Sequence, residues 1–144
     1  MKKIITLLLL MPLAYKAMSQ QSTTVADTIL VGSIEKNCPG GFEAFNKYIG
    51  KTAHPAARAY DNRKMGTTYV SFIIEPDGSV SDVCTIHAAG WGMDEEAIRV
   101  ISKSNNWIPA TIDGKPVRCF CRAAIEFFTD FDKRETWIRA KRID

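Results

Sequence analysis

Residues 68–87 read TYVSFIIEPDGSVSDVCTIH. Side chains two apart share one face of a strand, and in the first half these positions are apolar or β-branched: Thr68, Val70, Phe72 and Ile74. The tetrapeptide Glu75–Gly78 that follows is typical of a tight turn, because Pro restricts φ early in the turn and Gly accepts φ > 0 at its end. A second strand-like run, Ser79–His87, comes next. The segment therefore predicts a β-hairpin at the centre of the fold.

The chain after the hairpin predicts a helix and one long strand. Asp94–Lys103 has its apolar residues at helical spacing, with Asp94 as the expected N-cap. Trp107 is expected to pack back on the core, and Pro109 to prevent any continuation of the helix. Val117–Phe128 alternates along its whole length, which is unusually long for a strand in so small a domain.

The chain before the hairpin predicts two shorter helices. Phe42–Ile49 has apolar residues on one helical face, with Gly50 as a candidate C-cap, and Ala56–Asn62 follows Pro55. The leader, residues 20–38, is polar except for one apolar patch at Ile29–Val31. This patch is interpreted as part of a mobile leader or as a strand added at a sheet edge.

These elements predict an α+β domain over residues 39–128. A helix that returns the chain over one face makes the last strand antiparallel to the first. We therefore expect a three-stranded antiparallel sheet, in the order second, first, last, packed on two or three short helices. The last strand then lies at an edge. Residues 129–144 are highly charged, and we interpret them as a tail or a marginal helix.

Residues 1–19 have the pattern of a secretory signal peptide. Lys2 and Lys3 precede the apolar run Ile4–Ala14, and small residues stand at Ala17 and Ser19. The run is shorter than the roughly 20 residues that span a bilayer. We therefore expect a periplasmic protein, secreted through a cleaved signal peptide. The alternative is a protein anchored in the inner membrane by an uncleaved segment.

The charge balance argues against a nucleic-acid partner. Of 19 basic residues, Lys2, Lys3 and Lys16 leave with the signal peptide, so 19 − 3 = 16 remain against 16 acidic residues. A neutral secreted domain lacks the basic surface that binds phosphates.

The cysteine and histidine residues do not form a recognisable reactive site. Cys84 and His87 are three apart on a strand and so point to opposite faces, and the sequence has no Cys-x-x-Cys pair. No nucleophile–base pair is apparent, so we expect no enzyme, no cofactor or metal, and no small-molecule substrate. In an oxidising compartment we expect at most one disulfide, joining Cys38 to Cys84, Cys119 or Cys121, or else a free thiol.

An ordered series of short motifs runs through about 90 residues. They are Pro39-Gly40-Gly41, Pro55-Ala56-Ala57-Arg58-Ala59, Val70-Ser71-Phe72, Pro76-Asp77-Gly78-Ser79-Val80-Ser81-Asp82-Val83, Asp94-Glu95-Glu96-Ala97, Trp107-Ile108-Pro109-Ala110 and Asp113-Gly114-Lys115-Pro116-Val117. Together they resemble the C-terminal domain of TonB proteins, especially the version found in Bacteroidetes-type bacteria.

The resemblance implies a protein-binding function. In that family the domain binds an extended segment of a TonB-dependent outer-membrane transporter, which adds to the sheet edge as a strand. Carried over by position, the docking strand is Val117–Phe127, and the approach to it lies around Pro55–Arg58. The expected partner-binding residues are Val117, Arg118, Cys119, Phe120, Cys121, Arg122, Ala123, Ala124 and Ile125.

This chain departs from an energy-coupling TonB in two ways. Its apolar N-terminal segment is short, and only about 20 residues separate that segment from Cys38, where a transducer needs a long spacer. His54 also stands where family members often have Tyr. The partner is therefore expected to be a TonB-dependent transporter or another envelope protein. The alternatives are a membrane-retained transducer and a structural module that forms a homodimer through its edge strand.

One substitution follows from the expected edge. Proline at Cys121 or at Ala123, whichever points outward, should abolish strand addition by removing an N–H.

Overall fold

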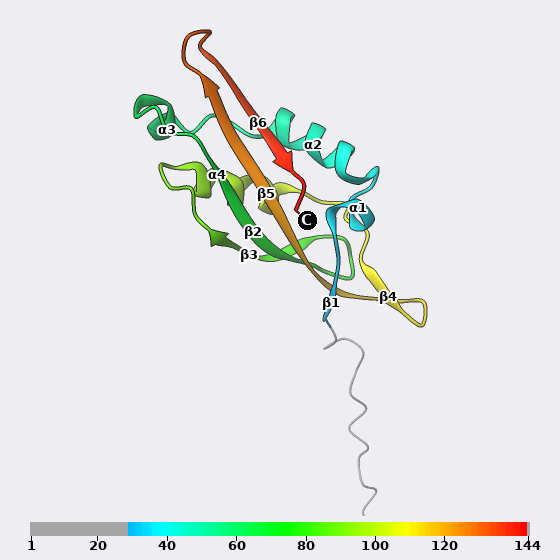
Figure 1. The fold of residues 1–144 in the computed structure, drawn as a ribbon. Coiled ribbons are helices and arrows are strands. Elements are labelled where there is room, and N and C mark those ends of the chain that lie inside the picture. The colour runs from blue at the N-terminus through cyan, green and yellow to red at the C-terminus, as the bar shows by residue number, and fades with distance from the viewer. Residues whose placement is uncertain (1–28, 144) are drawn as a thin grey trace, which may run out of the picture.

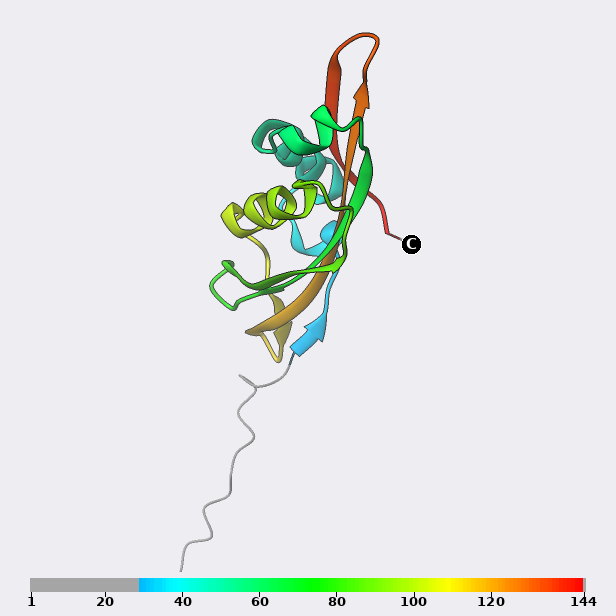
Figure 2. The same cartoon turned by 90° about the vertical axis from the view of Figure 1, so that its left-hand side faces the viewer.

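Four helices cover one face of a curled, mixed six-stranded sheet in the computed structural model, which describes residues 29–143 (Figures 1 and 2). The opposite face of the sheet carries no helix in this part of the chain (Figure 2). The strands are β1 (Ile29–Val31), β2 (Gly66–Ile74), β3 (Val80–His87), β4 (Ala110–Ile112), β5 (Lys115–Asp130) and β6 (Glu135–Lys141). The helices are α1 (Ile34–Asn37), α2 (Gly41–Thr52), α3 (Ala57–Asp61) and α4 (Met93–Lys103).

The predicted hairpin is confirmed. β2 and β3 pair antiparallel across the Glu75–Gly78 turn, which is closed by hydrogen bonds of 2.9 Å from Gly78 N to Glu75 O and from Glu75 N to Ser79 O. Gly78 has φ 83°, a conformation that costs glycine little. The Asp77 carboxylate accepts the Ser79 N–H at 2.9 Å and so braces the turn.

The core lies between the sheet and the helices. Val70, Phe72 and Ile74 of β2 are fully buried there, as their alternation predicts. Trp107 packs back as expected, with its ring 5.7 Å from Phe45 of α2 and 5.1 Å from Phe72. The helices thus bury one face of the sheet through aromatic and aliphatic contacts, the main stabilising term in so small a domain.

The expected three-stranded antiparallel sheet is wrong in extent. β5 lies beside β2, and β2 beside β3, but β1, β4 and β6 also pair with β5, and β1 does so in parallel. The reason is that a strand has two sides: β2 pairs with one side of β5, while β1 and β6 pair with the other side over partly the same residues. The last predicted strand is therefore not a free edge.

Residues 135–141 form a strand, and the expected tail or marginal helix is wrong there. Ile138 and Ala140 are buried, while Trp137 and Arg139, which alternate with them, are exposed. This alternation has the period of a strand, and the many charged residues of the segment lie at its exposed positions and at the turn.

Of the two interpretations of Ile29–Val31, the added strand is right. α1 follows it directly, so the described part of the leader belongs to the folded domain. The expected signal peptide, residues 1–19, lies outside the described residues.

Two helix ends differ from expectation. α2 continues through Gly50 to Thr52, and α4 begins one residue early, with Gly92 as its N-cap. Asp94 instead lies in the first turn of α4. Its carboxylate accepts the N–H groups of Ala89 and Gly90, each at 2.8 Å, so it holds the preceding loop against the helix.

Candidate docking edge

The outer side of β5 is the side turned away from β2. Two hydrogen bonds show which residues of β5 direct their backbone N–H and C=O groups toward it. Gly32 N donates to Phe120 O at 2.9 Å, so the backbone groups of Phe120 face outward. Ala140 N of β6 donates to the Asn46 side chain at 2.9 Å, which turns Ala140 away from β5. Alternate residues of a strand present N–H and C=O to the same side. The outward-facing positions of β5 are therefore the even-numbered ones, among them Arg122.

Two strands share this outer side. β1 pairs with Arg118–Phe120, and β6 with Ala124–Asp130. Between β1 and β6 the segment Cys121–Ala123 has no strand partner on this side within the described residues. We call this segment the edge gap.

A cavity of about 350 Å³ opens at the edge gap. One wall is formed by Arg122, Ala123 and Ala124 of β5, and the opposite wall by the start of α1, residues 32–35. Lys141 and Arg142 of the C-terminal segment also line it. The gap is therefore a recessed piece of strand backbone beside Lys141 and Arg142, of which Arg142 is paired with Glu35 on the opposite wall.

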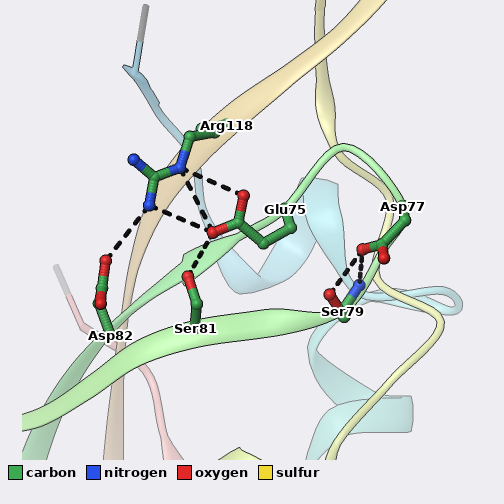
Figure 3. A network of polar contacts seen from close by, with 6 residues as sticks. All are labelled: Glu75, Asp77, Ser79, Ser81, Asp82 and Arg118. Atoms are coloured by element: carbon green, nitrogen blue, oxygen red, sulfur yellow. Dashed lines mark hydrogen bonds and ion pairs between the residues drawn. The ribbon is translucent and has the colours of Figure 1, made fainter. Parts of the chain in front are cut away.

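Charge is distributed unevenly along the outward-facing positions. Arg118 Nη2 lies 3.2 Å from both Glu75 Oε1 and Asp82 Oδ2, so its charge is compensated (Figure 3). The hydrogen bond from Ser81, together with Arg118, lowers the pKa of Glu75. Arg122 is exposed and, like Lys141, has no ion-pair partner within residues 29–143.

β3 is the other edge of the sheet, and the described residues leave its outer side unpaired. Its register with β2 shifts twice, between Tyr69 and Val70 and between Ser71 and Ile73. Asp82 also has φ 49°. Such irregularities bend an edge strand and hinder continuous pairing with another chain. The regular outer side of β5 is thus the better template for an added strand.

A family profile described as the C-terminal domain of Gram-negative bacterial TonB protein matches residues 55–128. The chain belongs to this family. The match runs from the residues before α3 into the long strand β5 and so includes β2, β3, α4 and all but the last two residues of β5. No curated protein and no solved structure showed significant similarity to the chain.

TonB C-terminal domains form a non-enzymatic family of envelope protein-interaction domains, and TonB-dependent transporters are among their partners. In this TonB C-terminal domain, no helix between residues 29 and 143 has the length and apolar character needed to cross a membrane. No group of three His, Cys, Asp or Glu residues in the same range is arranged to hold a metal ion.

The structure divides the nine expected partner-binding residues by face. The side chains of Val117, Cys119, Cys121, Ala123 and Ile125 are buried in the core and cannot contact a partner. Arg118, Phe120, Arg122 and Ala124 alternate with them on the helix-free face. A strand added to β5 would therefore contact the backbone of the outward-facing residues and few side chains, chiefly Arg122.

The expected approach at Pro55–Arg58 is not on the outer side of β5. It leads into α3, where Tyr60 packs against Phe131 at the tip of the β5–β6 hairpin with ring centroids 5.9 Å apart. The pairing of β1 lies toward the other end of β5.

The four cysteine residues are free in the structure. Cys84 is exposed on the helix-free face, with its Sγ 3.1 Å from the Ser71 hydroxyl. Cys119 and Cys121 are buried on the helix face, where burial raises the pKa of the Cys121 thiol. Cys38 packs against the same core, so the sheet separates it from Cys84. A bridge from Cys38 to Cys119 or Cys121 stays a prediction.

Sequence reasoning missed Lys141, because the strand that carries it was not recognised. The alternation of buried and exposed residues along 135–141 is the signal that predicts this strand.

The proline test also needs correction. Cys121 and Ala123 alternate with the outward-facing positions Phe120 and Arg122, so their N–H groups point toward β2. Arg122 is the residue to substitute.

Proposed function

We propose that the chain is a periplasmic protein-binding module whose outer β5 side accepts an extended segment of a TonB-dependent outer-membrane transporter or of a related envelope protein. The partner segment adds as a strand, so backbone hydrogen bonds supply most of the affinity. The observation that carries this proposal is the outer side of β5 itself. This side is covered at Arg118–Phe120 only by the three-residue strand β1, and it has no strand partner at the edge gap.

The sequence features outside the described residues agree with this location. Residues 1–19 have the pattern of a secretory signal peptide, and an extended partner segment would be met in the periplasm. A membrane-retained transducer requires that these residues stay attached. Mass determination of the protein isolated from the host distinguishes the two forms.

The test is an NMR titration of the protein, as processed by the host, with extended N-terminal peptides of the host's own TonB-dependent transporters. We expect saturable amide shifts concentrated in Arg118–Ala124. Shifts confined to β3, Val80–His87, would move the docking site to the other edge. An absence of shifts at millimolar peptide would contradict transporter docking.

Arg122 allows a matched pair of variants. Arg122→Pro removes the outward N–H, while Arg122→Ala keeps it and removes only the side chain. We expect the proline variant to lose at least tenfold in affinity, since one ladder hydrogen bond and the strand path are both lost. The alanine variant should lose less. Equal affinities for the two variants would exclude strand addition at this position.

Self-association through the sheet edge is the second candidate. The unpaired outer side of β3 favours it, whereas the two register shifts of that strand oppose it. Light scattering over a wide concentration range decides whether a dimer forms.

A further inference from the structure

β1 occupies part of the proposed docking edge. Its three residues run parallel to β5 in the register Ile29↔Arg118, Leu30↔Cys119 and Val31↔Phe120. The chain thus supplies its own added strand at the place where a partner strand is proposed to bind.

β1 is weakly held by side chains. Ile29 is 46% exposed and Val31 is 83% exposed, so neither gains much from burial. Only Leu30, which shares the face of its partner Cys119, points toward the core. The strand therefore depends mainly on backbone hydrogen bonds, which any extended segment can replace.

The chain directly after β1 is held firmly. Ser33 N donates to the Asn37 side-chain oxygen at 2.9 Å, and Asn37 Nδ2 donates to Ile108 O at 2.7 Å. α1 is thereby fixed to the loop before β4. Gly32 joins β1 to this anchored segment, and glycine has the wide conformational freedom that a hinge needs.

A partner strand has more backbone to pair with than β1 does. β1 turns away at Gly32, after the position of Phe120, whereas the edge gap continues through Ala123. A parallel strand that keeps the β1 register and continues straight would face Arg118 through Ala123. The cavity beside the gap provides room for this path between β5 and the start of α1.

Charge adds a preference to this path. Arg118 is compensated by Glu75 and Asp82, but Arg122 and Lys141 have no acidic partner within residues 29–143. In the β1 register, the partner residue opposite Arg122 comes three positions after the residue that replaces Leu30. An acidic side chain at that position would face Arg122. A carboxylate there would gain a charge-assisted contact.

We infer that β1 is a displaceable internal occupant of the docking edge. The partner is an extended segment that replaces β1 in parallel, with an apolar residue in the place of Leu30 and an acidic residue three positions later, opposite Arg122. This inference rests on the proposed function. Because β1 is tethered, it competes at a high effective concentration. A partner therefore binds only if its own contacts with β5 are more favourable than those of β1. Removing β1 raises the apparent affinity for the partner. The factor is the reciprocal of the fraction of molecules in which β1 is already released.

The experiment uses two six-residue probes, Ile-Leu-Val-Thr-Glu-Val and the same peptide with Gln in place of Glu. Their binding is measured by NMR to the processed protein and to its Leu30→Asp variant. We expect the Glu probe to bind at least fivefold more tightly than the Gln probe. We also expect Leu30→Asp to bind the Glu probe at least fivefold more tightly than the unchanged protein does. On saturation, the amides of Ile29–Val31 should lose exchange protection while those of α1 keep theirs.

A disulfide lock gives a test that does not depend on how Leu30→Asp folds. Leu30→Cys places a thiol opposite Cys119, and mild oxidation should join the two, as peptide mapping verifies. The locked protein should bind at least tenfold more weakly than the same variant after reduction.

The outcomes separate the inference from the proposed function. Equal affinity in the locked, reduced and Leu30→Asp forms, with β1 still protected, overturns displacement but leaves peptide binding in place. Equal affinity of the two probes overturns the acidic preference. Failure of both probes and of the host peptides to bind any form, including reduced Leu30→Cys, overturns the proposed function together with the inference.

Discussion

Asn37 and Ile108 are 71 residues apart in sequence and joined by two hydrogen bonds of 2.7 Å, from Asn37 Nδ2 to Ile108 O and from Ile108 N to Asn37 O. Asn37 is buried, with 6% of its surface exposed. This contact fastens the leader to the domain, although residue 37 lies outside the stretch that matches the family profile.

Asn37→Leu should lower the free energy of unfolding by about 1–3 kcal/mol, because it leaves the Ile108 carbonyl and the Ser33 N–H without their side-chain partner. Urea unfolding measures the loss. Lys36→Ala, at an exposed neighbouring position, is the control and should have little effect. Equal stability of the two variants would contradict a structural role for the leader.

Ile138→Ala tests whether β6 belongs to the folded domain. Ile138 is buried against the core, so we expect a loss of roughly 2–3 kcal/mol in the free energy of unfolding. Glu135→Ala, at the exposed start of the same strand, should change stability by less than about 0.5 kcal/mol. A segment that is only a tail would tolerate both changes equally.

Asp94→Ala should release the loop before α4. The Asp94 carboxylate accepts three hydrogen bonds, from Ala89 N, Gly90 N and the buried Thr68 hydroxyl, the last at 2.7 Å. We expect a loss of about 2–3 kcal/mol and faster hydrogen exchange at residues 89 and 90. Glu95→Ala, one residue later and exposed, controls for the loss of charge near the helix N-terminus.

The Glu75 cluster predicts a pH dependence of stability. Because the hydrogen bond from Ser81 and the pairing with Arg118 lower the pKa of Glu75 below its usual 4.5, the folded state favours the charged carboxylate. This stabilisation is present above pH 4.5 and is lost as the pH falls through the lowered pKa. Since the carboxylate is partly exposed, it is worth at most about 1 kcal/mol.

Glu75→Gln measures this contribution. Its unfolding free energy should lie below that of the unchanged protein at neutral pH, and the difference should vanish in acid. Asp82→Asn, at the more exposed partner of Arg118, should show a smaller effect. A difference between Glu75→Gln and the unchanged protein that stays constant with pH would show that the carboxylate charge is not the cause.

Gly32→Ala should disturb the seating of β1. A Cβ at this position would lie 2.9 Å from Cys121 Sγ and would also overlap Cys119 Sγ and the Asn37 side-chain oxygen. We expect a loss of about 1–3 kcal/mol from overpacking and faster hydrogen exchange in Ile29–Val31. Adding Cys119→Ala removes one overlapping sulfur and should restore part of the protection. No change in exchange would mean that β1 does not depend on this close approach.

Local patterns predicted the centre of the domain correctly. The alternation along Thr68–Ile74, the turn at Glu75–Gly78 and the apolar face of α4 are read from neighbours in sequence, and the structure confirms each of them. The order of turn residues also predicted the family. These features depend on short-range preferences of φ and on side-chain periodicity, which a sequence displays directly.

The pairing on the outer side of β5 depended on contacts between distant segments. Whether Ile29–Val31 hangs free or pairs with Arg118–Phe120 depends on a parallel contact across almost 90 positions, and nothing within β1 specifies its partner. The strand period of 135–141 is visible, but only the turn after Asp130 and the buried place for Ile138 make it β6. Sequence thus determined the β2–β3 hairpin, the long strand β5 and which of their residues face the core. Tertiary structure alone decided which strands cover β5, because backbone pairing is indifferent to side-chain identity and is settled by the space that the folded core leaves open.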